Sequence, residues 1–130
     1  MEKQELMNEM IERGRKYVIP ERFNEWREIC LKNCDSEAGC KAIKDIFGMI
    51  SAITVAKQPL QYVARSFDRQ IYNDYEWDWI EKQIVRFSPK GYHFVMGIHR
   101  ERSSRFIEEL ENLRNENKSF ESQRLSGVRV

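Results

Sequence analysis

The sequence predicts an all-α protein, a single compact bundle of five to six helices with a long C-terminal helix and a short polar tail. Apolar residues recur at helical spacing almost throughout, and no stretch has the strict alternation of a half-buried β-strand. Charged residues make up 33% and hydrophobic residues 41% of the chain, which is typical of a folded protein. At 130 residues the chain is large enough for one domain. We expect an all-helical domain over residues 1–117 and a flexible tail over residues 118–130.

The first two helices are predicted from apolar spacing and one proline. The first helix runs from Lys3 to Tyr17 and has one apolar face. Pro20 begins the second helix, because a proline is tolerated in the first turn, where its missing N–H costs no hydrogen bond. The apolar residues of the second helix are Phe23, Trp26, Ile29 and Cys30.

The third helix is expected at the centre of the bundle. Asp35 or Ser36 caps its N-terminus, and few charges follow. Gly48 lies within this helix, where the lack of a side chain would permit close contact with another helix. The apolar stripe consists of Cys40, Ile43, Ile46, Phe47, Ile50, Ile53 and Thr54.

A break near Asn73 separates the fourth helix from the fifth. Pro59 opens the fourth helix, whose inward face carries Val63, Phe67 and Ile71. On one continuous helix, at about 100° per residue, this face would lie far around the axis from the next apolar stripe. Asn73 and Glu76 have the spacing of a capping box, which places the start of the fifth helix there. The second stripe consists of Trp77, Ile80, Ile84 and Phe87.

The sixth helix is predicted to be long. Ser88 and Pro89 end the fifth helix and start the sixth, with Ser88 as the cap and Pro89 at the first helical position. We expect this helix to reach Asn115 and the polar residues 118–130 to form a loose tail. The apolar seam of the sixth helix consists of Val95, Ile98, Phe106, Leu110 and Leu113.

The net charge and the hydropathy pattern favour a soluble, cytoplasmic protein without a membrane partner. A net charge of +1 gives no bulk attraction to nucleic acid or acidic lipid. The N-terminus has acids and no apolar core, unlike a signal peptide. The longest weakly charged run, Ile46 to Ala56, is about half as long as a membrane-spanning helix.

Local charge is uneven, however. An acidic block in the fifth helix is followed by a basic segment, and such neighbours usually neutralise each other within the fold or across a dimer. The acids of the block are Asp74, Glu76, Asp78 and Glu81. The bases of the segment are Arg86, Lys90, Arg100, Arg102 and Arg105.

Arg102 occupies a seam position of the sixth helix, where an apolar side chain is expected. A buried guanidinium needs an acidic partner, because an unpaired buried charge costs several kcal/mol. Asp74, Asp78 or Glu81 could supply that partner. Two alternatives remain open: Arg102 extends its head group to solvent, or it forms a charged pocket for an anion or a partner.

Cysteine and histidine chemistry has little support. Cys30, Cys34 and Cys40 match no zinc or iron–sulfur spacing, and a thiolate site would need His93 or His99 as a further ligand. We interpret the cysteines as reduced, packed thiols and expect no metal and no cofactor. The chain contains no nucleophile elbow, zinc-protease motif, P-loop or dinucleotide fingerprint. A small enzyme that uses Cys/His chemistry is therefore the third hypothesis.

The aromatic and acidic fifth helix favours a non-enzymatic protein-binding or regulatory protein that occupies the surface of a protein partner. A homodimer is one form of this hypothesis. Tryptophan and tyrosine framed by charge are typical interface anchors. The acidic block could also mimic nucleic acid. The candidate partner-binding residues are Tyr75, Trp77, Asp78, Trp79, Glu81, Arg100, Arg102 and Arg105.

The alternative is a nucleic-acid-binding module that uses the basic sixth helix and the tail arginines, Arg124 and Arg129. Residues 58–80 can be compared with a helix-turn-helix, but the fit is poor. Asp68 stands where a glycine normally makes the turn, and the reading helix would carry the acidic block toward the phosphates.

Overall fold

The computed structural model describes residues 2–67 and 71–128. Within this part of the chain the structure is all-α, and no strand occurs. The helices are α1 (Glu2–Tyr17), the 3₁₀ helix η1 (Pro20–Arg22), α2 (Phe23–Asn33), α3 (Glu37–Val55), α4 (Leu60–Arg65), α5 (Asp74–Phe87), α6 (Gly91–Met96) and α7 (Ser104–Val128).

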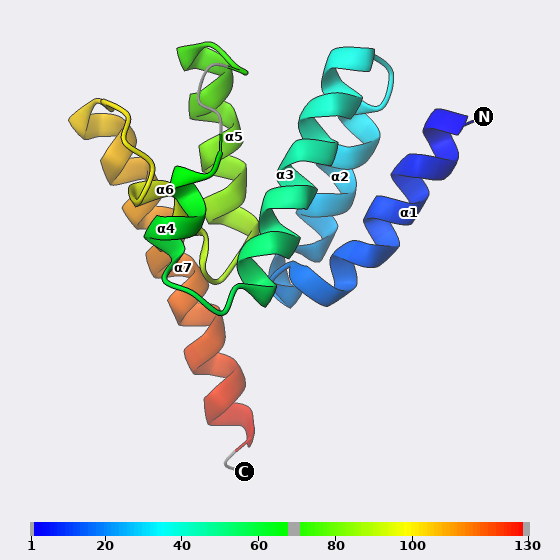
Figure 1. Ribbon diagram of the computed structural model, residues 1–130. Helices are drawn as coiled ribbons and strands as arrows, with labels where there is room; N and C mark the ends of the chain where they lie inside the picture. The colour runs from blue at the N-terminus through cyan, green and yellow to red at the C-terminus, as the bar shows by residue number, and fades with distance from the viewer. Residues whose placement is uncertain (1, 68–70, 129–130) are drawn as a thin grey trace.

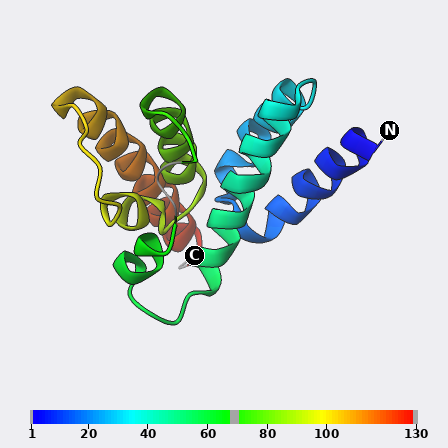
Figure 2. The same cartoon turned by 45° about the horizontal axis from the view of Figure 1, so that its top comes forward.

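The helices form two groups that meet at α3. Figures 1 and 2 show α1, α2 and α3 side by side in one group and α4 to α7 in the other. The helix α3 packs against α1 and α2 within its own group and against α5 and α6 across the junction. Its buried residues include Ile43, Ile46, Ile50 and Ile53, so the predicted central position of the third helix is confirmed.

Trp26 on α2 lies at the centre of the hydrophobic core, with none of its surface exposed. Its ring lies 6.2 Å from the Phe47 ring of α3 and 5.4 Å from the Phe87 ring of α5, measured between centroids. The indole N–H donates to the Met10 carbonyl of α1 at 3.1 Å. A single side chain therefore connects four helices, and its polar atom is satisfied as burial requires.

The close approach of α1 to α2 requires a glycine at position 14. A Cβ atom added to Gly14 would lie 2.4 Å from the indole nitrogen of Trp26. The prediction for Gly48 is wrong, since a Cβ there would meet nothing within 4 Å. Gly48 lies on the exposed side of α3, away from any partner helix.

Two predicted helix starts are confirmed. Ser36 Oγ accepts the Gly39 N–H at 2.9 Å and caps α3. Asn73 and Glu76 form a capping box at the start of α5, with Glu76 N–H donating to Asn73 Oδ1 at 2.8 Å and Asn73 N–H donating to Glu76 Oε1 at 3.0 Å.

The fourth helix is shorter than predicted. The helix α4 ends at Arg65, where the Ser66 N–H bonds to the Val63 carbonyl at 3.1 Å and tightens the last turn. Ile71 is exposed rather than inward, because the helix that would carry it has already ended. The prediction for Asp68 concerns a residue outside the part of the chain that the structure describes.

The predicted sixth helix is two helices, α6 and α7, joined by the Gly97–Ser103 loop. The helix α6 begins at Gly91, so Pro89 precedes it rather than occupying its first position. Gly97 lies close to α4, since an added Cβ would be 3.0 Å from the Gln61 Cα. Ser103 Oγ then accepts the Phe106 N–H at 3.1 Å and starts α7.

The prediction of a loose tail from residue 118 is wrong as regards secondary structure, because α7 continues to Val128. The heptad-like spacing of Leu110 and Leu113 continues through Asn117, Phe120 and Arg124. The ring of Phe120 lies under the Arg22 guanidinium at 5.2 Å, and Arg124 Nε donates to Glu21 at 2.9 Å. These contacts with η1 hold the second half of α7. The predicted flexibility of residues 118–130 stays a prediction.

Among the described residues, no helix combines the length and the apolar character that are needed to cross a bilayer.

Replacing Gly14 with alanine is expected to destabilise the fold by about 1–3 kcal/mol, because the added methyl overpacks Trp26. In an ordinary helix the same change stabilises by about 0.5–1 kcal/mol. The control is Gly48→Ala, which meets open space and should stabilise by that amount. Urea unfolding monitored by tryptophan fluorescence measures both, and equal effects of the two variants would contradict the packing described for Trp26.

Candidate functional site

Three acids of α5 face the Gly97–Ser103 loop, which supplies Arg100. The Arg100 guanidinium bonds to Asp78 and to Glu81, the latter at 2.6 Å, and lies 3.9 Å from Asp74. Burial lowers the pKa of Arg100, but the hydrogen bonds to Glu81 and Asp78 outweigh that effect, and the net pKa is raised. Arg100 therefore stays charged and ties the loop to α5.

Arg102 binds the same Glu81 carboxylate in bidentate geometry. Its Nε donates to Oε1 at 2.9 Å and its Nη2 to Oε2 at 2.7 Å. Arg102 also donates to the Val95 carbonyl at 2.8 Å and to the Arg100 carbonyl at 3.1 Å. The prediction that Arg102 pairs with an acid of the fifth helix is confirmed, and the partner is Glu81.

Glu81 is the hub of this cluster, and its side chain is fully buried. The side chains of Arg100 and Arg102 are 11% and 4% exposed. A buried carboxylate is tolerated only when it is paired and hydrogen-bonded, and here two guanidinium groups meet that requirement. Two bases of the basic segment, Arg100 and Arg102, thus pair with acids of the acidic block within the fold.

The eight predicted partner-binding residues separate into buried residues and residues that reach solvent, and Asp78 lies between the two sets. Trp77 lies in the hydrophobic core beside Tyr72, with ring centroids 5.6 Å apart. Glu81, Arg100 and Arg102 form the internal cluster, with Asp78 at its edge. The residues that reach solvent are Tyr75, Trp79 (half-buried), Arg105 and the outer part of Asp78.

Tyr72 fixes the start of α5 to α3. Its hydroxyl donates to the Asp45 carboxylate of α3, and Lys41 of α3 lies 5.8 Å from its ring centroid. Burial and the hydrogen bond to Asp45 raise the pKa of Tyr72, so the phenol keeps its proton. The first turn of α5, which carries Tyr75, is therefore held on the α3 side as well as by its capping box.

The three cysteines are free thiols, with Cys30 and Cys40 buried and Cys34 partly exposed. Burial, followed by the neighbouring Cys34, raises the pKa of Cys30 to about 12, so the thiol stays protonated at neutral pH. Cys34 donates to the Leu31 carbonyl at 3.1 Å and Cys40 to the Cys34 carbonyl at 3.2 Å. No group of three or more His, Cys, Asp and Glu among the described residues is placed to hold a metal ion.

A second buried arginine was not found from the sequence. Arg22 of η1 donates to Asn117 at 3.2 Å, to Glu116 at 2.9 Å and to Glu25 at 3.2 Å. Asn117 in turn donates to the Val85 carbonyl of α5 at 2.9 Å. The signal that could have revealed this cluster is the uninterrupted spacing of α7 through Asn117, which places a polar residue in an apolar seam.

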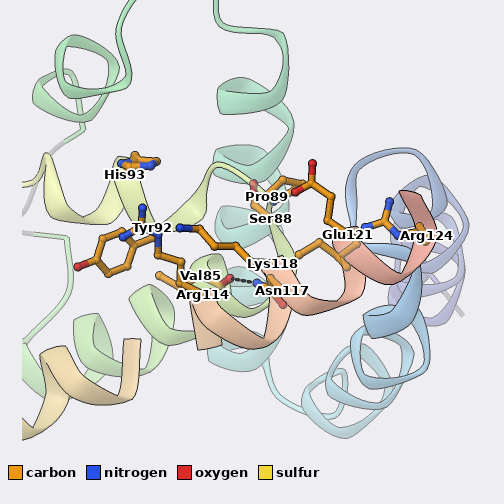
Figure 3. Close-up of a pocket in the computed structure, with 11 residues that line it drawn as sticks. Val85, Ser88, Pro89, Tyr92, His93, Arg114, Asn117, Lys118, Glu121 and Arg124 are labelled. Atoms are coloured by element: carbon orange, nitrogen blue, oxygen red, sulfur yellow. Dashed lines mark hydrogen bonds between the residues drawn. The ribbon is translucent and has the colours of Figure 1, made fainter. Parts of the chain in front are cut away.

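The groove between α6 and α7 was also missed. It has a volume of about 240 Å³ and contains several cationic side chains, as Figure 3 shows. Both histidines lie on the surface: His93 lines this groove, and His99 lies in the Gly97–Ser103 loop rather than in a helical seam. The groove is lined by Ile19, Val85, Ser88, Pro89, Tyr92, His93, Arg114, Asn117, Lys118, Glu121 and Arg124.

Comparison of the chain with known proteins finds no match among protein-family models, curated proteins or solved structures.

Replacing Glu81 with glutamine is expected to cost about 3–5 kcal/mol in the free energy of unfolding, because two guanidinium groups lose their buried counter-charge. The control is Asp74→Asn. The Asp74 side chain is 91% exposed, and its carboxylate comes no closer than 3.9 Å to the Arg100 guanidinium. Loss of this exposed charge should therefore change the free energy of unfolding by less than about 1 kcal/mol. Urea denaturation measures both, and similar small effects would show that Glu81 does not organise the cluster.

Alkylation should distinguish the three cysteines. At pH 8 a thiol with a pKa of about 12 is almost entirely protonated, so buried Cys30 should not react with iodoacetamide in the folded protein. Cys34 is more exposed than Cys30 and Cys40 and should be modified first. Peptide mass spectrometry before and after denaturation in urea measures this. Rapid modification of Cys30 in the native state would revive the thiol-enzyme hypothesis.

Proposed function

We propose that this is a non-enzymatic protein that binds a protein partner through the end of the molecule where α5 and α7 begin. The observation that carries the proposal is Tyr75, which is 88% exposed in the first turn of a helix that a capping box and the Tyr72–Asp45 hydrogen bond hold in place. We call the surface made by Tyr75, Asp78, Trp79 and Arg105 the α5–α7 end surface.

The two helices that form this surface run side by side. Figure 1 shows α5 and α7 starting at the same end of the molecule, and Lys82 of α5 lies 3.6 Å from Glu109 of α7. Tyr75 is the second residue of α5 and Arg105 the second residue of α7. The aromatic side chain of Tyr75 and the cation of Arg105 therefore lie at the same end of the molecule, each on a regular helix rather than on a loop.

Tyr75 and Trp79 are four residues apart and share one side of α5. Tyr75 is exposed and Trp79 is half-buried, so the two aromatic side chains together extend from the core to the solvent. Aromatic side chains of this kind act as interface anchors, because they bury a large area and lose little conformational entropy. Asp78 and Arg105 would form the polar rim that surrounds such an anchor.

In this proposal Trp77, Glu81, Arg100 and Arg102 support the surface instead of contacting the partner. Trp77 is buried in the core, and the fully buried Glu81 holds α5 against the Gly97–Ser103 loop through its hydrogen bonds to Arg100 and Arg102. A surface that is already ordered before binding loses less entropy on association, which favours affinity.

The alternatives have less support. Nucleic-acid binding relied on Arg100 and Arg102, which are engaged with Glu81, and on Arg124, which pairs with Glu21. Arg105 is the remaining exposed base of that set, since Arg129 falls outside the described residues. Mimicry of nucleic acid relied on the acidic block, of which Asp78 and Glu81 are hydrogen-bonded to Arg100 or Arg102.

Replacing Tyr75 with alanine should weaken partner binding at least about thirty-fold, which corresponds to the roughly 2 kcal/mol of an interface anchor. Stability should change by no more than about 0.5 kcal/mol, because the side chain has few contacts to lose. The tagged wild type and variant are used for affinity purification from the protein's own type of cell, with quantitative mass spectrometry. The dissociation constant of the protein that is lost is then measured with purified components.

The matched control is Tyr62→Ala, an exposed tyrosine on α4, 52% accessible and outside the α5–α7 end surface. It should leave the partner bound. Equal losses for both tyrosine variants, or none for Tyr75→Ala, would remove the basis of the proposal. Sedimentation velocity of the purified protein tests the homodimer form, in which Tyr75→Ala should shift the dimer toward monomer.

A further inference from the structure

The groove between α6 and α7 has a fixed floor and cationic walls. Its floor includes Asn117, which donates to the Val85 and Arg86 carbonyls at 2.9 and 3.3 Å and is buried. The short helix α6 contributes Tyr92 and His93 to one wall, and α7 contributes the other wall. Contacts with η1 and with α5 hold α7 on both sides of the groove. The shape of the groove therefore does not depend on a bound ligand.

Two cations of α7 lie in this groove without an acidic partner. Arg114 and Lys118 are four residues apart on one face of the helix, and neither takes part in an ion pair in the described part of the chain. Like charges at this spacing repel each other. Their neighbours Arg22 and Arg124 do have acidic partners, at 2.9 Å in each case. These two cations outnumber the one acid that lines the groove, Glu121, so the groove carries an excess of positive charge.

The groove also orients these cations. The guanidinium of Arg114 lies 4.5 Å from the centroid of the Tyr92 ring, and the Tyr92 ring meets that of His93 edge-on at 5.9 Å. Figure 3 shows Lys118 extended toward Tyr92, while Glu121 points toward the Pro89 side of the groove. One end of the groove thus gathers an arginine, a lysine and a histidine, and the single acid that lines it lies at the other end.

From this arrangement we propose that the groove binds a small phosphate monoester whose organic part carries hydroxyl groups. A guanidinium fork and an ammonium group suit a tetrahedral oxyanion, which accepts hydrogen bonds from several directions. His93 adds a ring nitrogen at the same end. The Glu121 carboxylate would accept hydrogen bonds from the hydroxyl groups at the far end.

The size of the groove limits the ligand. Its volume of about 240 Å³ lies below the roughly 300–1,000 Å³ of sites for drug-sized molecules. A phosphate with a short polyol fits this volume, and a nucleic-acid duplex does not enter it. The proposal is independent of partner binding, since no residue of the α5–α7 end surface lines the groove.

The test is an NMR titration of the ¹⁵N-labelled full-length protein at constant ionic strength. The probes are glycerol 3-phosphate, inorganic phosphate and sodium chloride. Saturable shifts at the groove residues are expected for both phosphates and not for chloride, with tighter binding of glycerol 3-phosphate. Inorganic phosphate binding as tightly as the ester would overturn the hydroxyl part of the proposal, and shifts equal to those of chloride would overturn all of it.

Lys118→Gln should weaken the binding of glycerol 3-phosphate at least tenfold, and Lys32→Gln, an exposed lysine on α2, should not. Both positions are exposed, so neither change should disturb the fold, and circular dichroism checks this. Glu121→Gln should strengthen the binding of inorganic phosphate and reduce the preference for the ester. Equal losses at Lys118 and Lys32, or tighter and strongly salt-dependent binding of a single-stranded oligonucleotide, would contradict the proposal.

Discussion

The shared carboxylate of Glu81 is the constraint on which the arrangement of the second helical group depends. Arg100 and Arg102 both reach it from the Gly97–Ser103 loop, and that loop decides where α6 ends and where α7 begins. Replacing such a cluster with apolar residues is often neutral or stabilising in other proteins, so the presence of the cluster is not by itself evidence of high stability. An apolar loop could pack in several registers, whereas two guanidinium groups around one buried carboxylate have few alternatives.

Arg22 positions the other end of α7 in a similar way, through buried polar contacts. It joins η1 to Glu116 and Asn117, which lie more than 90 positions away in the chain. Between the two arginine clusters, Leu110 and Leu113 supply the apolar contact of α7. A long helix with a modest apolar face is thus positioned by directional polar contacts, which explains how it can present Arg105 at one end and the α6–α7 groove further along.

Local signals were sufficient to predict most of the fold. The break at Asn73 follows from two apolar faces that one helix cannot bury, and the cap at Ser36 follows from residue type. The split between α6 and α7 could not be predicted in this way, because Val95 and Ile98 enter the same core as Leu110 and so continue its spacing across the loop. The loop is stabilised by Glu81, about twenty residues away in sequence. For the candidate site, the sequence identifies the charged residues, but which of them are buried depends on such long-range pairs.

The ion pairs of Arg100, Arg102 and Arg22 also determine which charges of the protein remain unpaired. A net charge of +1 suggests a surface without preference for anions, yet the internal ion pairs are not spread evenly. Arg100 and Arg102 neutralise acids of α5, and Arg22 neutralises Glu25 and Glu116. Arg114 and Lys118 remain without an acid, side by side in a groove of fixed shape. Because an anion in that groove would meet two cations that form no ion pair in the described part of the chain, its binding would not require an existing ion pair to break.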